Sequence, residues 1–159
     1  MFMGALLSVA DVSDEPLDDE TRHALELALR YFREAAPKHT ADEEESLFPR
    51  LRQLQSSEMK DALAQMDALE QDHRWAEPLH AVVEKIGNCY LEAGMLSSAD
   101  AQEFREAVEQ LATMYKRHIE IEDRRVFPVA ARLLPKEAKD EISQEMASRR
   151  NIKPVVGLK

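Results

Sequence analysis

One motif occurs twice in this chain and constrains how its helices can come together. The first copy runs from His39 to Pro49 and the second from His118 to Pro128. In each copy a glutamate follows the histidine by four residues, and a Phe-Pro pair ends the copy. Because residues four apart lie on one face of a helix, each copy presents an imidazole and a carboxylate in the same direction. Two such helices facing each other would form a site for a metal ion.

The composition favours a single helical domain. The chain has 159 residues, only 4 of which are glycine, and it is rich in alanine, leucine, glutamate and arginine. We expect one domain over residues 1–150, followed by a tail over residues 151–159. The net charge of −10 repels nucleic acid and anionic lipid, so neither is an expected partner. No apolar stretch is long enough for a transmembrane helix, so we expect no membrane span.

Apolar residues recur at helical spacing over three long stretches, at about 20–54, 57–93 and 97–126. A short final helix is expected at about 136–150. Prolines should kink or divide the first two stretches, and a glycine should end the second: Pro37, Pro49, Pro78 and Gly94. The sequence has no strand-like alternation of any length. It therefore predicts an all-α, antiparallel helical bundle.

Ionisable side chains interrupt the apolar stripes where leucine or isoleucine would ordinarily lie. A buried charge without a partner is strongly destabilising, so these positions need a compensating group. Hydrogen-bonded His–Glu pairs without an ion are one explanation, but the repetition of the same motif favours metal coordination. His80 lies about 10 Å from His73 along a helix axis, so we expect it to line a cavity rather than share one ion. The candidate metal ligands are His39, Glu43, His73, Glu77, His118 and Glu122.

The motif residues fall into three pieces: His39-x3-Glu43 with Leu47-Phe48-Pro49, Asp72-His73, and His118-x3-Glu122 with Phe127-Pro128. Together they resemble the hemerythrin-like, or HHE cation-binding, family over roughly residues 20–135. The resemblance implies a four-helix bundle that holds a non-haem di-iron centre. It also implies the ligand roles: terminal imidazoles from His39, His73 and His118, and bridging carboxylates from Glu43 and Glu122.

The last bridging carboxylate has an alternative. Hemerythrins proper use His-x4-Asp on the last ligand helix, and that spacing would point to Asp123. We prefer Glu122, because it matches Glu43 in the internal repeat. Glu77 stands where hemerythrins proper have a second histidine, which would shift the site from reversible O2 carriage towards redox or iron sensing.

The resemblance further implies that the first helix is truncated, either because the sequence starts too late or because the protein lacks that helix. The histidine of the family's first helix would precede Met1, and residues 1–9 would be only the end of that helix. An incomplete bundle leaves an apolar groove, which a second copy of the chain could cover. We therefore expect a homodimer.

These observations together predict a cytoplasmic, non-enzymatic protein that holds non-haem iron. It would bind O2 or NO, or sense redox state or iron supply. The single Cys89 excludes an internal disulfide and fits a reducing compartment. Two alternatives stay open: a di-iron oxidase or peroxidase, suggested by Glu77 and Tyr115, and a helical interaction module with an incomplete, metal-free site. Imidazole and carboxylate also suit Mn and Zn, so the sequence does not fix the metal.

Overall fold

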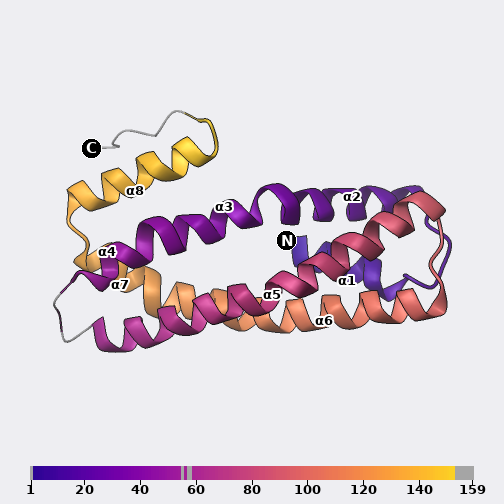
Figure 1. Cartoon of the computed structure of the whole chain (residues 1–159), viewed down its shortest axis with the longest axis horizontal. Coiled ribbons are helices and arrows are strands. Elements are labelled where there is room, and N and C mark those ends of the chain that lie inside the picture. Colours follow the sequence, from indigo (N-terminus) through magenta and orange to yellow (C-terminus); the bar gives the residue numbers. More distant parts are fainter. Residues whose placement is uncertain (1, 55, 57–58, 153–159) are drawn as a thin grey trace. The chain divides into compact units, whose positions relative to one another are not determined.

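The computed structural model describes residues 2–54, 56 and 59–152, and is built of helices (Figure 1). The two elements labelled η are π-helices, in which hydrogen bonds span five residues rather than four. No strand occurs in these residues, so the predicted all-α class is confirmed. Most of the predicted tail, residues 153–159, lies outside the described residues. The elements in chain order are α1 (Phe2–Asp11), α2 (Asp19–Glu34), α3 (Ala36–Ala41), η1 (Asp42–Leu47), α4 (Phe48–Arg52), α5 (Met59–Ala93), α6 (Ser98–Ile121), η2 (Glu122–Val126), α7 (Phe127–Leu133) and α8 (Lys136–Arg149).

Local capping chemistry sets several helix boundaries. Asp18 precedes α2, and its carboxylate accepts a hydrogen bond from the N–H of Thr21 at 2.7 Å. The Ser97 hydroxyl does the same before α6, accepting from the N–H of Asp100 at 3.1 Å. At the other end of a helix, Gly94 follows α5 with a φ of 73°. This left-handed conformation is one that glycine adopts without steric cost.

Prolines lie in the first turns of three helices, where a backbone N–H would have no acceptor within the helix, so its absence costs no hydrogen bond within that helix. The first predicted stretch is divided as expected, because α2 ends at Glu34 and Pro37 lies in the first turn of α3. Pro49 and Pro128 similarly lie in the first turns of α4 and α7. By contrast, Pro78 lies inside α5 without ending it.

The helices form two compact units, each with its own apolar core. The first unit combines residues up to Ala35 with Asp72–Arg117, and the second combines Ala36–Gln71 with the chain from His118 onward. Both α5 and α6 therefore contribute residues to both units. The largest buried apolar side chains are Tyr90, Phe104, Leu6, Leu25 and Leu111 in the first unit, and Phe48, Leu51, Met59, Met66 and Leu69 in the second.

Close packing within the first unit brings α2 against α5. A Cβ atom at Gly87 would lie 3.0 Å from both δ-carbons of Leu29, so only glycine allows this approach without a shift. The Tyr90 hydroxyl donates to the carbonyl oxygens of Val12 and Glu15, at 3.2 and 2.9 Å. These two hydrogen bonds tie the segment after α1 to α5. The apolar residues of α1 thereby join the first core.

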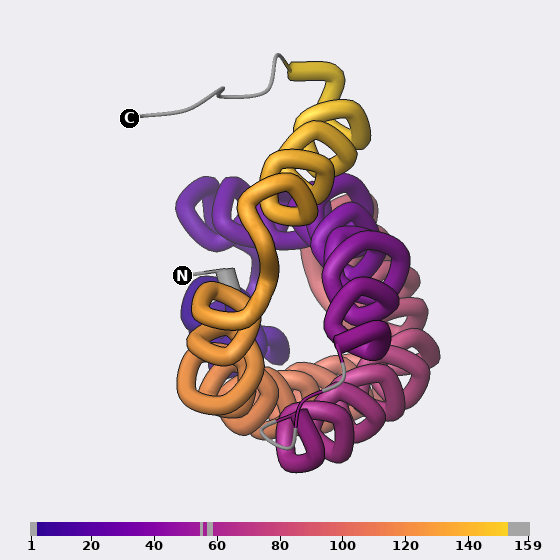
Figure 2. The backbone as a smooth tube through the Cα atoms, turned by 90° about the vertical axis from the view of Figure 1, so that its left-hand side faces the viewer, coloured from indigo at the N-terminus to yellow at the C-terminus, as the bar shows by residue number. Residues whose placement is uncertain are grey.

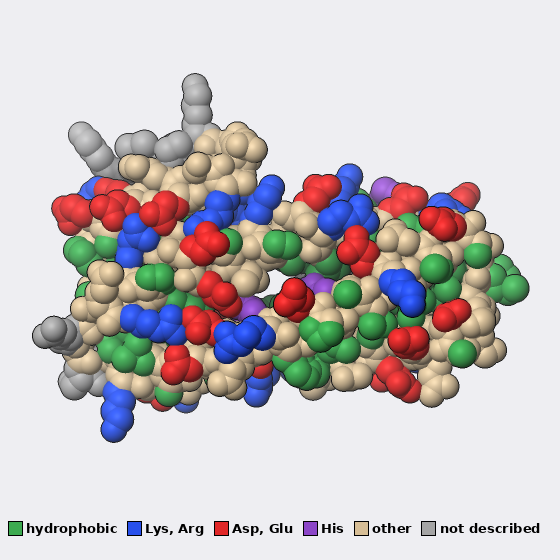
Figure 3. All heavy atoms as spheres, viewed as in Figure 1, with side chains coloured by type: hydrophobic (Ala, Val, Ile, Leu, Met, Phe, Trp, Pro, Cys, Tyr) green, Lys and Arg blue, Asp and Glu red, His purple; other side chains and the backbone are tan. Residues whose placement is uncertain are grey.

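In the second unit, the C-terminal helix α8 lies alongside η1 (Figure 2). Acidic and basic side chains are interspersed over the face seen in Figure 3, so the negative net charge is not gathered in a single patch there. Within the part of the chain that the structure describes, every helix is too short or too polar to cross a membrane.

The left-handed backbone at Gly94 gives a test of the fold. We expect Gly94→Ala to lower the free energy of unfolding by about 1–2 kcal/mol, because a Cβ atom is strained at this φ although the surrounding space is open. Gly4→Ala is the matched control: Gly4 also has open space, but it lies within α1 at an ordinary φ. Its replacement should raise the free energy of unfolding by about 0.5–1 kcal/mol. Urea unfolding measures both, and equal changes in the two variants would contradict the assignment.

Candidate metal centre

The two copies of the motif follow the same backbone path. In each, the histidine lies near the end of an α-helix, a π-helix follows, and a second α-helix begins at the phenylalanine. The N–H of Phe48 donates to the carbonyl oxygen of Glu43, and the N–H of Phe127 donates to that of Glu122. Both hydrogen bonds reach back five residues. The repeat in the sequence is therefore also a repeat in backbone geometry, in which Glu43 corresponds to Glu122.

Proline explains why the α-helical pattern changes at these places. Pro49 and Pro128 have no N–H to donate to the carbonyl four residues earlier. In each copy this gap in the series of α-helical backbone hydrogen bonds coincides with a π-helical turn just before the proline. Such turns are rare in proteins and occur frequently at functional sites. The sequence predicted a kink or division at Pro49, but it did not predict the π-helical form.

Three of the predicted ligands converge in the second unit. One ligand atom from each of His39, Glu43 and Glu122 lies within 4.8 Å of the other two. His39 Nε2 is 3.6 Å from Glu43 Oε1 and 3.9 Å from Glu122 Oε1. A fourth predicted ligand joins them, because His118 Nε2 lies 2.9 Å from Glu122 Oε1. The second unit therefore brings together two imidazoles and two carboxylates.

Both carboxylates of this group are buried. Glu43 is 2% exposed, Glu122 is 3% exposed, and His118 is 2% exposed, whereas the side chain of His39 is 48% exposed. Two neighbouring acids that are withdrawn from water repel each other unless a proton or a cation lies nearby. The group therefore has one open side, at His39, and an interior with two buried carboxyl groups.

The ionisation of Glu122 reflects a balance of opposing effects. Burial alone would raise the pKa of this carboxyl group, because it disfavours the charged form. Hydrogen bonding to His118 and Glu43, together with the nearby imidazoles, outweighs burial and lowers the pKa below its ordinary value. Glu122 is thus ionised near neutral pH, as a metal ligand must be.

The structure separates Glu122 from the alternative ligand Asp123. Glu122 faces the interior, whereas its neighbour Asp123 is exposed. Glu122 also shares the backbone register of Glu43. Both observations favour Glu122 as the carboxylate of the second copy.

The two remaining predicted ligands lie on the part of α5 that belongs to the first unit. His73 is half-buried and Glu77 is exposed. Glu77 follows the buried Ala76, so its carboxylate points away from the core position beside it. That His73 and Glu77 bind metal stays a prediction from the sequence.

His80 belongs to an aromatic cluster in the first unit. Its Nε2 atom is hydrogen-bonded to the Tyr115 hydroxyl at 3.0 Å, and its ring packs edge-on against Phe32 with centroids 4.9 Å apart. Tyr115 in turn packs against the first core. Burial lowers the pKa of His80 below its ordinary value, so the imidazole is held neutral.

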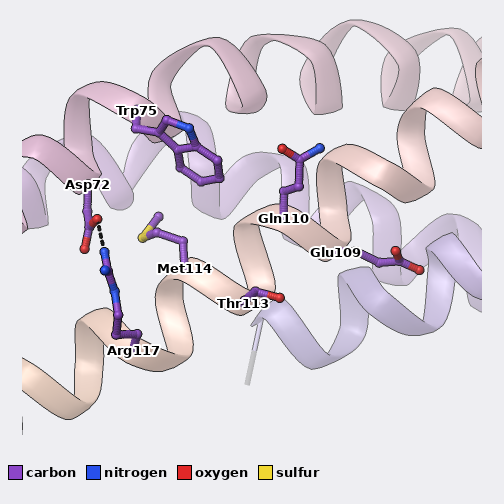
Figure 4. Close-up of a pocket in the computed structure, with 7 residues that line it drawn as sticks. All are labelled: Asp72, Trp75, Glu109, Gln110, Thr113, Met114 and Arg117. Atoms are coloured by element: carbon purple, nitrogen blue, oxygen red, sulfur yellow. Dashed lines mark hydrogen bonds and ion pairs between the residues drawn. The ribbon is translucent and has the colours of Figure 1, made fainter.

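A surface groove of about 670 Å³ also lies in the first unit, on α5 and α6 (Figure 4). Asp72 and Arg117 form an ion pair at one end of the groove, and the exposed side chain of Trp75 projects into it from α5. Its lining residues include none of the six predicted metal ligands. The lining residues are Asp72, Trp75, Glu109, Gln110, Thr113, Met114 and Arg117.

The sequence prediction missed one buried acid, Asp42. This residue begins η1, is 3% exposed and is ion-paired with Arg149 and Arg150. The signal available in the sequence was the adjacent Arg149-Arg150 pair at the end of the predicted final helix. Nothing in the local spacing linked that pair to an acid more than 100 residues earlier.

The family model described as the hemerythrin HHE cation binding domain matches residues 2–130. This range includes both copies of the motif and all six predicted ligands. The chain has no match among curated proteins.

The depressed pKa of His80 predicts a specific pH dependence of stability. The unfolded chain takes up the imidazole proton first as the pH falls below about 6.5, so the free energy of unfolding decreases in that window. We expect His80→Gln to make this decrease shallower between pH 7 and pH 5 (roughly the range in which histidine titrates). Urea unfolding of metal-free protein at several pH values measures the effect. The exposed His23 provides the control His23→Gln, and an equal change of slope in both variants would contradict the prediction.

Proposed function

We propose that the second unit of this protein holds a non-haem iron centre. The chain belongs to the hemerythrin HHE cation-binding domain family. The observation that carries this proposal is the buried pair Glu43 and Glu122 beside the imidazoles of His39 and His118. A metal cation would neutralise the two acids and accept nitrogen donors from both copies of the motif. The proposal thus accounts for the charge, the burial and the repetition together.

The donor set fits iron well. Carboxylate oxygens and imidazole nitrogens suit Fe, and they also suit Mn and Zn. We favour iron because the chain belongs to the hemerythrin HHE cation-binding domain family. Iron held by these residues would supply a redox-active centre that binds a small diatomic molecule such as O2 or NO.

The protein's own side chains divide the remaining tasks. His118 is buried, and its Nε2 atom lies 2.9 Å from Oε1 of Glu122, which restrains the orientation of that carboxylate. His39 lies at the exposed side of the group, where a small molecule can approach from solvent. The surrounding core of the second unit excludes bulk water from Glu43 and Glu122. These features favour binding or sensing over turnover of a large substrate.

The enzyme alternative has less support. A di-iron oxidase or peroxidase was suggested by Glu77 and Tyr115, but Glu77 is exposed and Tyr115 is hydrogen-bonded to His80 in the first unit. We therefore propose a non-enzymatic protein that binds O2 or NO, or that responds to redox state or iron supply. A homodimer formed through an incomplete bundle stays a prediction, as does a cytoplasmic location.

Metal content tests the proposal directly. Protein produced in iron-replete medium should carry at least about one equivalent of iron per chain, measured by elemental analysis after gel filtration. We expect Glu43→Gln and Glu122→Gln each to lower metal affinity by roughly 10- to 100-fold or more, because each removes a buried negative charge and a ligand. Chelation should also lower the melting temperature of the wild type, since a bound ion stabilises only the folded state.

Asp123→Asn is the matched control for Glu122→Gln. It removes the same charge one residue away, but from an exposed position, and should leave the metal content unchanged. Wild-type protein that binds no iron, Mn or Zn would overturn the proposal and favour the metal-free interaction module. Loss of metal in Asp123→Asn but not in Glu122→Gln would instead reassign the ligand.

A further inference from the structure

The π-helix η1, which carries Glu43, is held by the C-terminal helix α8. Arg149 Nη1 lies 2.9 Å from Asp42 Oδ1, and Arg150 Nη2 lies 2.5 Å from Asp42 Oδ2. Each oxygen of this buried carboxylate is therefore bound by a different arginine. Asp42 directly precedes Glu43 in the chain, so whatever fixes Asp42 also restrains the backbone of the candidate ligand.

Arg149 makes further contacts with the same short element. Its Nη1 atom also donates to the Ser46 hydroxyl at 2.9 Å, and its Nη2 atom pairs with Glu45 Oε2 at 3.0 Å. One guanidinium thus reaches three of the six residues of η1. Such multidentate binding fixes orientation as well as charge.

A second set of ion pairs joins the same elements. Arg50 Nη2 lies 2.8 Å from Glu145 Oε1 and 3.1 Å from Glu141 Oε2, both on α8. Arg50 Nη1 also donates to the backbone carbonyl oxygen of Ser46 at 2.9 Å. Arginines at the end of α8 therefore bind an acid of η1, and an arginine of α4 binds acids of α8.

The helix α8 lies beyond the part of the chain that matches the family, whereas the residues that it contacts on η1 lie within it. The match ends at residue 130, and α8 begins at Lys136. Only Ile142 and Ala147 of this helix are buried apolar residues, so ion pairs supply much of its specific attachment. The role of α8 must accordingly be inferred from its contacts with η1.

We propose that Arg149 and Arg150 are positioning residues for the metal centre: by neutralising Asp42 they hold η1, and with it Glu43, in the orientation that binds metal. This inference rests on the metal-binding function proposed above. Without the arginines, Asp42 would be a buried charge with too little compensation. The first turn of η1 would then rotate to bring Asp42 to water, and Glu43 would leave its place beside Glu122.

The sign of the expected effect separates positioning from simple electrostatics. Removing two positive charges near a cation site should strengthen cation binding by Coulomb's law. The positioning role predicts the opposite, a weaker affinity. A second substitution, Asp42→Asn, removes the charge that drives the rotation, so it should restore affinity in the arginine variant even though it deletes a negative charge.

Titration with Co²⁺, whose visible spectrum reports its coordination, tests the inference on the full chain. We expect the double variant R149Q/R150Q to bind Co²⁺ roughly 10- to 100-fold more weakly than the wild type, as is typical when a group that supports a ligand is lost. At saturation the stoichiometry should equal that of the wild type, but the spectrum should change. The triple variant with D42N should recover most of the lost affinity and the original spectrum.

Arg52→Gln is the matched control within the second unit. Arg52 also binds two carboxylates, Asp67 at 2.9 Å and Glu70 at 2.8 Å, but these lie on α5. Its replacement should leave Co²⁺ affinity unchanged. Circular dichroism identifies any variant that does not fold; if R149Q/R150Q does not, the single variant R150Q, which removes one of the two arginines on Asp42, should still bind Co²⁺ more weakly than R52Q and then provides the measurement.

Different results overturn different parts of the argument. Equal Co²⁺ affinity in the wild type and R149Q/R150Q would overturn the positioning role and leave the metal site intact. A weaker affinity that D42N does not restore would also overturn it. Wild-type protein that binds no Co²⁺ would overturn the proposed function and this inference with it.

Discussion

Two acids buried next to each other need positive charge close by, and much of the second unit is organised by that requirement. Glu43 and Glu122 are withdrawn from water, yet the pKa of Glu122 is lowered rather than raised. The imidazoles of His39 and His118 supply part of the compensation. Asp42, the third buried acid, is compensated differently, by two guanidinium groups that are charged at every physiological pH. The π-helix η1 thus carries Asp42, which the two arginines neutralise, next to Glu43, the candidate metal ligand.

A π-helical turn before a proline occurs in both copies of the motif and supports this arrangement. A proline removes one amide donor, and a π-helical turn precedes it in both copies. The wider turn keeps the glutamate of each copy facing inwards while the next helix begins at the phenylalanine. Because the same π-helical geometry occurs in both copies, Glu43 and Glu122 have equivalent backbone environments, as expected of two residues that contribute to one site.

Much of this could be predicted from the sequence, because much of it is local. Helix spans and the stop at Gly94 depend on residues within a few positions of one another. The pairing of each histidine with a glutamate four residues later depends only on helical geometry. The convergence of the two copies followed from their repetition, and the structure brings His39, Glu43, His118 and Glu122 together accordingly.

The features that sequence reasoning missed depend on distant residues or on fine angular detail. The ion pairs between Asp42 and the end of α8 join positions that no periodicity relates. The π-helical turns depend on how the chain accommodates a missing donor, and proline alone does not specify that. The exposure of Glu77, whose role as a ligand stays a prediction, also depends on a fine angle, because a step of about 100° round the helix separates it from the buried Ala76.

Each compact unit is assembled from two separate stretches of chain, and this has a consequence for biosynthesis. The apolar side chains of α2, such as Leu25 and Leu29, share a core with Phe104 and Leu111 of α6. When α2 leaves the ribosome, α1 has been translated, but the residues of α5 and α6 that complete the core have not, and domains generally fold as complete units. Roughly two thirds of the polypeptide must emerge before that hydrophobic surface can be covered.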